Sequence, residues 1–475
     1  MFKQYINGQL VDGKGKAMNV YDPATDEIVD VVGCADKEQT LEALNAAKEA
    51  FNSWSKVPVS ERAKWLYKFR EACVQERDTL VELVMKESGR PYAAACGDVD
   101  WLLTSLSYYA EEAKRINGTI LPSIMVGDKV NHHMIAKEPV GVTVAHLAWN
   151  YPLGNAGIKL APAIASGCAC IIKPSSQTPL ATLYLGVIAE KIGFPKGVLN
   201  ILAGPSGEVA KTLNESNIPR LISLIGSYET GLKLMQQAST SVKRFSLELG
   251  GNAPVVVMPD ADLDETAANI VAKKVGFAGQ TCVNYNRIYI HKDIYEVMCD
   301  KIAKELSKVK LGKHKDEGYV MGPVIDLQAR DRMLELIEQA KQNGATLVMG
   351  GEVPANQKGS YITPALLKDV NDSMRVSTEE IFGPIIPVQP FSTIDEAIEK
   401  SNNTIFGLSA YFFGHNAQQM TRYIEGVKAG EIFVNGGIGS EFTPHAGAKQ
   451  SGIGCDKSKD SLEEYYDIKF ISLIS

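Results

Sequence analysis

Two residues of this chain, Glu248 and Cys282, have side chains that could serve one covalent reaction. Cys282 ends the sequence Gly279-Gln280-Thr281-Cys282, and Glu248 precedes Leu249-Gly250-Gly251. A thiolate is a strong nucleophile, and a nearby carboxylate can activate the water that later releases a covalent intermediate. The glycines allow a tight turn and a close backbone approach to a ligand. The alternative is a glutamate at a strand end and a buried structural cysteine.

Further motifs follow the same order along the chain as in a known family. They are Ala148-Trp149-Asn150-Tyr151-Pro152, Lys173-Pro174-Ser175-Ser176-Gln177-Thr178-Pro179, Gly226-Ser227 and Glu379-Glu380-Ile381-Phe382-Gly383-Pro384. With the two segments above, the set resembles the aldehyde dehydrogenase superfamily from about Tyr5 to about Tyr466. Gly279-Gln280-Thr281-Cys282 and Pro444-His445-Ala446-Gly447 are most similar to the branch of lactaldehyde and succinate-semialdehyde dehydrogenases. The resemblance implies oxidation of an aldehyde to a carboxylic acid.

The resemblance assigns three catalytic residues. Cys282 would attack the carbonyl carbon, and the side chain of Asn150 with the backbone N–H of Cys282 would stabilise the oxyanion. Glu248 would then activate the water that hydrolyses the thioester. From the residues alone, Asn150 could instead satisfy backbone groups in a turn. Two other functions remain open: a CoA-acylating enzyme, whose relatives typically lack this glutamate, and a protein that kept the fold and lost the activity.

The resemblance also implies a nicotinamide cofactor, held by Trp149, Lys173, Ser176, Gly226, Ser227, Leu249, Glu380 and Phe382. NAD-preferring relatives often carry at position 176 a glutamate whose charge would repel a 2′-phosphate. Because Ser176 is neutral, we expect NADP or NAD to serve, with NADP tolerated or preferred. Lys173 could instead be an ordinary surface lysine, and Ser227 could be only a helix N-cap.

By motif position, the substrate pocket would include Tyr151, Asn155, Ile158, Thr281, Val283 and His445. Succinate-semialdehyde enzymes often have arginines where this chain has Ile158 and Gly276. We therefore expect a short polar aldehyde that is lactaldehyde-, sulfolactaldehyde- or semialdehyde-like. His445 could bind a hydroxyl or a small anion in its cationic form, or could face solvent in a loop.

Composition sets limits on the class of protein. The chain has 475 residues, of which 45% are hydrophobic and 22% charged, as in an ordinary globular protein. The net charge of −7 argues against nucleic acid as a partner. The eight cysteines include no CxxC pair or Cys/His cluster, so the sequence indicates no metal site and a reducing compartment. With no signal peptide or membrane-spanning stretch apparent, we expect a cytoplasmic protein without a membrane partner.

The patterns around these residues predict an α/β fold. Helical periodicity over residues 37–109 is broken at Pro58 and Pro91. Apolar strands then alternate with helices, first over residues 140–251 and again after Asp260. This alternation favours parallel sheets covered by helices, which bind dinucleotides at strand ends. We expect a Rossmann-like cofactor-binding domain (residues 1–118 and 140–249) and a second α/β catalytic domain (residues 250–454), with the active site at their junction.

The remaining segments predict a small β arm. Residues 121–138 are extended in character, with Gly127-Asp128 suggesting a hairpin, and the tail at 463–475 alternates apolar and polar residues. We expect residues 119–139 and 455–475 to form an arm and tail that pair with each other. In the resembling family this arm serves oligomerisation, which implies a homodimer or a homotetramer.

Overall fold

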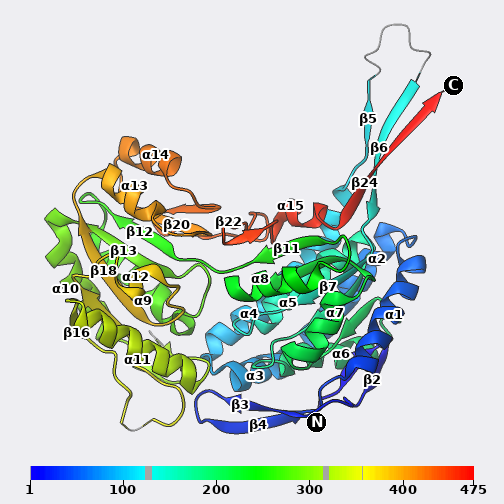
Figure 1. Cartoon of the computed structure of the whole chain (residues 1–475), viewed down its shortest axis with the longest axis horizontal. Helices are drawn as coiled ribbons and strands as arrows, with labels where there is room; N and C mark the ends of the chain where they lie inside the picture. Colours follow the sequence, from blue (N-terminus) through cyan, green and yellow to red (C-terminus); the bar gives the residue numbers. More distant parts are fainter. Residues whose placement is uncertain (1, 123–130, 314–319, 356, 475) are drawn as a thin grey trace.

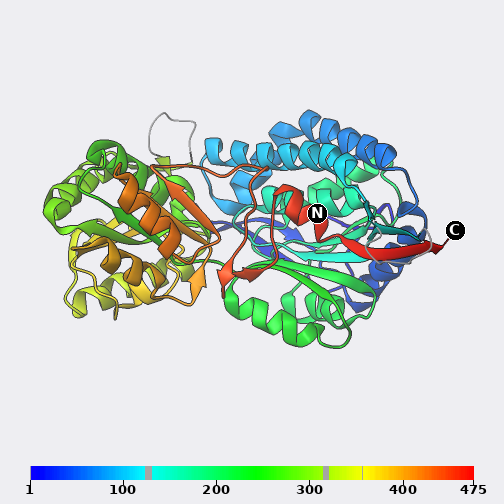
Figure 2. The same cartoon turned by 90° about the horizontal axis from the view of Figure 1, so that it is seen from above.

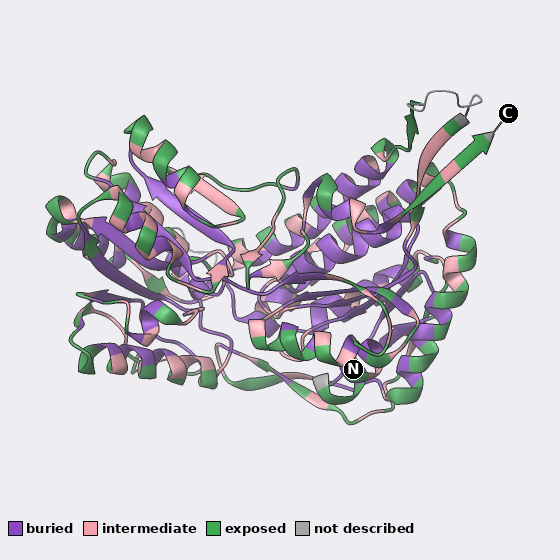
Figure 3. Ribbon diagram, turned by 45° about the horizontal axis from the view of Figure 1, so that its top comes forward, coloured by how far each residue is buried: buried purple, intermediate pink, exposed green. Residues whose placement is uncertain are grey.

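The computed structural model describes residues 2–122, 131–313, 320–355 and 357–474 of the chain. It has two lobes, each built on a twisted sheet with helices on both faces, and an arm that projects from one lobe (Figures 1 and 2). The strands of both sheets are mostly buried, whereas the helices expose their outer faces (Figure 3). The predicted α/β class with an added β arm is confirmed.

The first lobe contains an eight-stranded sheet whose five central strands are parallel. In sheet order its strands are β2 (Gln9–Val11), β1 (Gln4–Ile6), β9 (Leu199–Ile201), β8 (Ala169–Lys173), β7 (Val142–His146), β10 (Pro219–Ile225), β11 (Arg244–Glu248) and β23 (Gly452–Ile453). The turn between β1 and β2 is Asn7-Gly8, and both residues have positive φ, as the predicted tight hairpin requires.

Helices cover both faces of this sheet because its central strands are apolar on both sides. In β8, Cys170 and Ile172 belong to one apolar cluster, and Ala169 and Ile171 belong to another. The helical elements of this lobe are α1 (Lys37–Trp54), α2 (Val59–Gln75), α3 (Arg77–Ser88), α4 (Tyr92–Glu112), η1 (Ala113–Arg115), α5 (Pro152–Ser166), α6 (Leu180–Lys191), η2 (Ser206–Ala210), α7 (Lys211–Glu215), α8 (Tyr228–Ala238) and α15 (Ser458–Glu463).

The second lobe contains a seven-stranded sheet that is parallel except at one edge. In sheet order its strands are β16 (Thr346–Met349), β17 (Ala365–Lys368), β18 (Ile385–Phe391), β13 (Tyr285–His291), β12 (Ala253–Val257), β20 (Ser409–Phe413) and β21 (Glu431–Val434). Its helical elements are α9 (Leu263–Val275), η3 (Gly276–Gly279), η4 (Lys292–Ile294), α10 (Tyr295–Leu306), α11 (Leu327–Gln342), α12 (Arg375–Thr378), α13 (Ile394–Asn402) and α14 (Ala417–Gly426).

The helical periodicity predicted over residues 37–109 corresponds to α1, α2, α3 and α4. Pro58 and Pro91 immediately precede α2 and α4, which confirms the two predicted helix breaks. The helical region has one further break that was not predicted, at Glu76 between α2 and α3. No glycine or proline marks it in the sequence; Glu76 leaves helical geometry with φ −101° and ψ 15°.

The arm is a three-stranded sheet formed by β5 (Thr119–Leu121), β6 (Asn131–Pro139) and β24 (Tyr466–Ile474). The C-terminal strand β24 pairs antiparallel with β6 along its whole length, so the expected pairing of tail and arm is confirmed. Gly127-Asp128, the expected hairpin tip, lies outside the described residues. In Figure 1 the arm projects from the first lobe, on the side away from the second lobe.

Three short two-stranded sheets complete the fold: β3 (Met18–Asp22) with β4 (Glu27–Val32), β14 (Lys310–Leu311) with β15 (Val320–Met321), and β19 (Phe406–Gly407) with β22 (Ala448–Lys449). The chain passes between lobes from β11 into β12, and it returns when β23 pairs with β11. Within the described residues, no helix combines the length and apolar character needed to cross a membrane.

Candidate active site

The candidate catalytic residues come from both lobes. Glu248 is the last residue of β11, and Asn150 lies in the loop between β7 and α5. Because β7, β10 and β11 are parallel, their carboxyl ends meet at one edge of the first sheet. Cys282 lies between η3 and β13 of the second lobe. The structure therefore brings these three residues together at the junction of the lobes.

The loop that carries Cys282 has an unusual backbone. Phe277, Ala278 and Gly279 all have positive φ, of 56°, 50° and 72°, and the first two are not glycines. Such conformations are costly and persist only where the surroundings enforce them. Here Gln280 supplies the constraint, because its side chain donates to Phe277 O (3.1 Å) and accepts from Ile325 N (2.8 Å). The position of the thiol is fixed by packing and hydrogen bonds.

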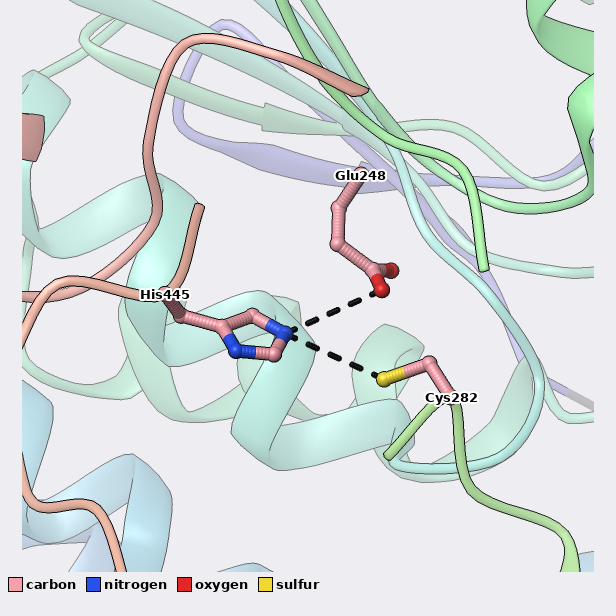
Figure 4. Close-up of side chains that lie close together, drawn as sticks. All are labelled: Glu248, Cys282 and His445. Atoms are coloured by element: carbon pink, nitrogen blue, oxygen red, sulfur yellow. Dashed lines mark hydrogen bonds and ion pairs between the residues drawn. The ribbon is translucent and has the colours of Figure 1, made fainter. Parts of the chain in front are cut away.

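His445 lies between Cys282 and Glu248 (Figure 4). Its Nε2 is 3.8 Å from the Sγ of Cys282 and 3.7 Å from a carboxylate oxygen of Glu248. On the other side of the ring, Nδ1 is 3.0 Å from Oε1 of Glu431, at the start of β21. The side chain of His445 is only 12% exposed. The alternative of a loop histidine facing solvent is therefore wrong.

Burial and charge determine the protonation of this group. Burial and the charge of Glu248 raise the pKa of the Cys282 thiol to about 12, while His445 acts to lower it. Burial lowers the pKa of His445, but its contacts with Cys282, Glu248 and Glu431 outweigh this effect, and the pKa ends well above its usual value. The neighbouring carboxylates therefore favour the cationic form of His445.

Asn150 is held against the cysteine loop by several contacts. Its Nδ2 donates to Gln280 O (3.2 Å), and its Oδ1 accepts from Nδ2 of Asn155 (3.4 Å). The fully buried Arg90 donates to the backbone oxygen of Asn150. The guanidinium also lies 3.9 Å from the ring centre of Phe277 and thus joins the two loops. The amide of Asn150 is thus held at the loop that carries Cys282, and both residues line one cavity.

A cavity of about 960 Å³ opens at this junction and extends along the carboxyl edge of the first sheet. Cys282, Glu248 and Asn150 line it, together with Trp149, Lys173, Ser176, Gly226, Ser227, Glu380 and Phe382 from the predicted cofactor set. Leu249 is the exception: its side chain is 4% exposed and packs in an apolar cluster against Gly231 of α8. A cofactor contact at Leu249 would therefore use its backbone.

The chemistry of the lining fits a nicotinamide dinucleotide. Lys173 is 5% exposed, and burial lowers its pKa to about 8, so the reading as a surface lysine is wrong. Among the residues that the structure describes, it forms no ion pair, which leaves its Nζ for ligand hydroxyls. Ser227 caps α8 by accepting from Thr230 N (3.3 Å), and a helix N-terminus favours a pyrophosphate. Glu380 accepts from Gly251 N (3.0 Å), and burial raises its pKa to about 8.

None of the predicted substrate residues lines that cavity. Thr281 has a buried hydroxyl without a partner in the described part of the chain, so it can bind a ligand. Asn155 donates to Ala148 O and to Asn150, so it positions the catalytic loop. Ile158 is buried in α5, Val283 is half-buried, and Tyr151 packs edge-on against Trp101 and Phe277.

Two residues of the site were missed by sequence reasoning. Glu431 lies on an edge strand and Arg90 precedes a helix, and nothing in their local sequence indicates a site. Both act through residues far away in the chain, which only the fold brings near. Arg90, which is buried beside Pro91, belongs to no periodic pattern or motif in the sequence.

A nucleotide-sized cavity at the edge of a parallel sheet, lined by a thiol, a carboxylate and an amide, is the arrangement expected of a dinucleotide-dependent oxidoreductase. The sequence model of the aldehyde dehydrogenase family matches residues 10–471. The chain belongs to this family, as its motifs predict, and is an aldehyde dehydrogenase.

Individual relatives match over nearly their full length. The chain is 36% identical to a glutarate-semialdehyde dehydrogenase of Pseudomonas putida, covering 100% of this chain and 98% of the relative. It is 37% identical to a 3-sulfolactaldehyde dehydrogenase of Pseudomonas putida, covering 99% and 96%. Among solved structures, an NADP-dependent enzyme of E. coli superposes with a TM-score of 0.96 at 35% identity, covering 100% of this chain and 98% of that one.

Proposed function

We propose that this enzyme oxidises a short, polar aldehyde to its carboxylic acid with NADP+ or NAD+. The observation that carries the proposal is the convergence of Cys282, Glu248 and Asn150 at one end of the dinucleotide-sized cavity. When bound there, the cofactor accepts a hydride. The other steps belong to side chains of this chain.

Cys282 forms the bond to the substrate. Its sulfur attacks the carbonyl carbon, and the oxygen becomes an oxyanion that accepts from Nδ2 of Asn150 and from the backbone N–H of Cys282. Losing one such donor typically costs about 2.7–4 kcal/mol of transition-state stabilisation. After the hydride has left, Glu248 takes a proton from water, the water oxygen attacks the thioester carbon, and the thiolate departs. Glu248 is suited to this role because its Oε1 is buried and accepts no hydrogen bond from the described residues.

Two observations support a polar substrate. His445 lies 3.8 Å from the sulfur of Cys282, and the neighbouring Thr281 has a hydroxyl that bonds to no group in the described part of the chain. The relatives named above act on glutarate semialdehyde and 3-sulfolactaldehyde, which are short aldehydes with a second ionisable group. A buried anion requires a charged partner. The favoured substrates are therefore lactaldehyde-, sulfolactaldehyde- or semialdehyde-like.

The test is a kcat/KM series measured by NAD(P)H formation. It runs from glycolaldehyde and lactaldehyde through 3-sulfolactaldehyde and succinate semialdehyde to hexanal and benzaldehyde, with Cys282→Ala as the inactive control. We expect a polar aldehyde to give the highest value and Cys282→Ala to lose turnover while still binding cofactor. A tenfold advantage for hexanal or benzaldehyde would overturn the polar-pocket proposal. Strict dependence on added CoA would replace hydrolysis by CoA acylation.

A further inference from the structure

Glu431 and His445 form a buried pair against the nucleophile that the steps above do not require. Nδ1 of His445 is 3.0 Å from Oε1 of Glu431, and each side chain is 12% exposed. The opposite nitrogen, Nε2, faces both Cys282 and Glu248, as the two dashed lines in Figure 4 show. A carboxylate oxygen of Glu248, the sulfur of Cys282 and a ring nitrogen of His445 all lie within 4.8 Å of one another. The ring therefore connects a remote carboxylate with the reacting sulfur.

The ring cannot easily turn away from the sulfur. The backbone of His445 exchanges two hydrogen bonds of 2.8 Å with Asp456, and Oδ1 of Asp456 lies 2.5 Å from Nζ of the buried Lys159. Glu431 is held in β21, which pairs with β20. The backbones of His445 and Glu431 are thus both held by hydrogen bonds to neighbouring segments. The contact between Nδ1 and Glu431 then turns Nε2 of the ring toward the sulfur.

The charges around the sulfur of Cys282 show why a positively charged His445 would matter. Glu248 is 6% exposed and Glu431 is 12% exposed, so two carboxylates already lie in a poorly solvated site. A thiolate at Cys282 would add a third negative charge beside them, which is unfavourable without a cation. Lys273 of α9 faces Cys282 and Glu431, and Cys455 and Asp456 adjoin the backbone of His445. Of these groups, only His445 has a charged donor within 4 Å of the sulfur.

We propose that His445 activates Cys282 as an imidazolium, and that Glu431 is the positioning residue that keeps the ring charged and turned toward the sulfur. The S–H bond of Cys282 breaks, its electron pair stays on sulfur, and the proton leaves to water. The thiolate then accepts from the Nε2–H of His445, which separates it from the charge of Glu248. The inference deepens the proposed function, since it concerns the nucleophile of that reaction, but it does not depend on which aldehyde is oxidised.

The experiment measures how fast iodoacetamide alkylates Cys282 in the cofactor-free enzyme between pH 5.5 and 10. Peptide mass spectrometry separates Cys282 from the other thiols, and the half-buried Cys96 serves as an internal reference. EDTA in all buffers keeps metal ions off the Glu248, Cys282 and His445 cluster. The variants are His445→Gln, Glu431→Gln and Glu248→Gln, with His415→Gln, an exposed histidine, as matched control.

The pKa of the Cys282 thiol lies above this pH range, so the alkylation rate at each pH reports the fraction of thiolate. We expect His445→Gln to shift that pKa upward by one unit or more, which lowers the rate at pH 7 by about tenfold or more. Glu431→Gln should lower the rate by less, because the ring remains but holds its proton less tightly. Glu248→Gln should shift the pKa downward and raise the rate, because a repelling charge is removed. His415→Gln and the reference thiol should match the wild type.

Coincident pH profiles for the wild type and His445→Gln would overturn the inference, as would an upward shift in Glu248→Gln. If His445→Gln does not fold, as judged by circular dichroism, Glu431→Gln decides alone: an unchanged profile refutes the positioning role. The assay uses no aldehyde and no cofactor. The shifts can therefore appear even if the substrate proposal fails, and they can be absent in an enzyme that oxidises polar aldehydes.

Discussion

At the scale of single residues, Cys282 and Glu248 must both carry a negative charge although they lie close together. The sulfur must become an anion to attack, while Glu248 must stay ionised to accept a proton from water. Because both groups are largely buried, each charge raises the cost of the other. Asn150 serves a later charge, the oxyanion, and it is held by Gln280 and Asn155 at the cysteine loop.

Replacing Glu248 by Gln should separate the two halves of the reaction. Without the base, thioester hydrolysis should slow by about 10²–10⁴-fold, whereas the first turnover should change far less. A rapid burst of NAD(P)H followed by a slow steady state in stopped-flow absorbance is the expected result. An unchanged steady-state rate would remove Glu248 from the mechanism.

Cofactor preference should depend on position 176. Ser176 lines the cavity as a neutral side chain whose Oγ donates to Gly204 O (3.4 Å). We expect the wild type to use NADP well, and Ser176→Glu to lower kcat/KM for NADP by about tenfold or more through repulsion of the 2′-phosphate, with less effect on NAD. Comparing kcat/KM for both cofactors in both proteins is the test. A wild-type preference for NAD of a hundredfold, about 2.7 kcal/mol, would contradict this assignment.

At the scale of elements, the segment from β22 to α15 holds the site together. β22 pairs with β19, whereas β23 joins the first sheet beside Glu248. Between β23 and α15 lies Asp456, which bonds to His445 through its backbone and to Lys159 of α5 through its side chain. This segment therefore fixes the position of His445 relative to Glu248.

Asp456→Asn should destabilise the enzyme by about 3–5 kcal/mol, because it leaves the charge of Lys159 buried and unpaired. The exposed pair of Arg330 and Asp331 offers a matched control, and Asp331→Asn should cost less than about 1 kcal/mol. Thermal unfolding followed by circular dichroism gives the comparison. Equal melting temperatures for Asp456→Asn and Asp331→Asn would show that the buried pair contributes little.

At the scale of the whole molecule, each lobe supplies part of the site, and the arm projects from the first lobe (Figure 1). Its strands expose large apolar side chains, namely Ile120, Leu121, Ile468, Phe470 and Leu473. Apolar side chains gathered on a projecting sheet are typical of surfaces that bind another chain. We propose that the arm joins copies of this chain in a homodimer or a homotetramer.

Phe470→Asp should weaken that assembly. Phe470 is 60% exposed, and burial of such a side chain at an interface contributes about 1.5–3 kcal/mol for each copy. We expect light scattering after size-exclusion chromatography to show a smaller species than in the wild type. Val297→Asp, at a 51% exposed position on α10 of the second lobe, should leave the mass unchanged. The same mass for wild type and Phe470→Asp, at micromolar and lower concentrations, would argue against an arm-mediated assembly.

The sequence alone was sufficient wherever the physical cause is local. Asn7-Gly8 sets a hairpin through its backbone preferences, Pro58 and Pro91 end helices, and alternating strands and helices imply parallel sheets. The motifs around Glu248 and Cys282 identified the family for the same reason, because the reacting groups stand in short, contiguous segments. The proposed limits of the two domains and the catalytic roles remain predictions.

Only the tertiary structure decided the environment of those groups. His445 was compatible with solvent or with the site, and Lys173 with a surface or a buried position, because neither burial nor orientation can be read from neighbours in sequence. Glu431 gave no signal at all, since its partner His445 lies in a separate loop and its effect reaches Cys282 through that ring. Charge interactions act through space, so the protonation of this site is determined by which distant segments the two sheets bring within about 4 Å.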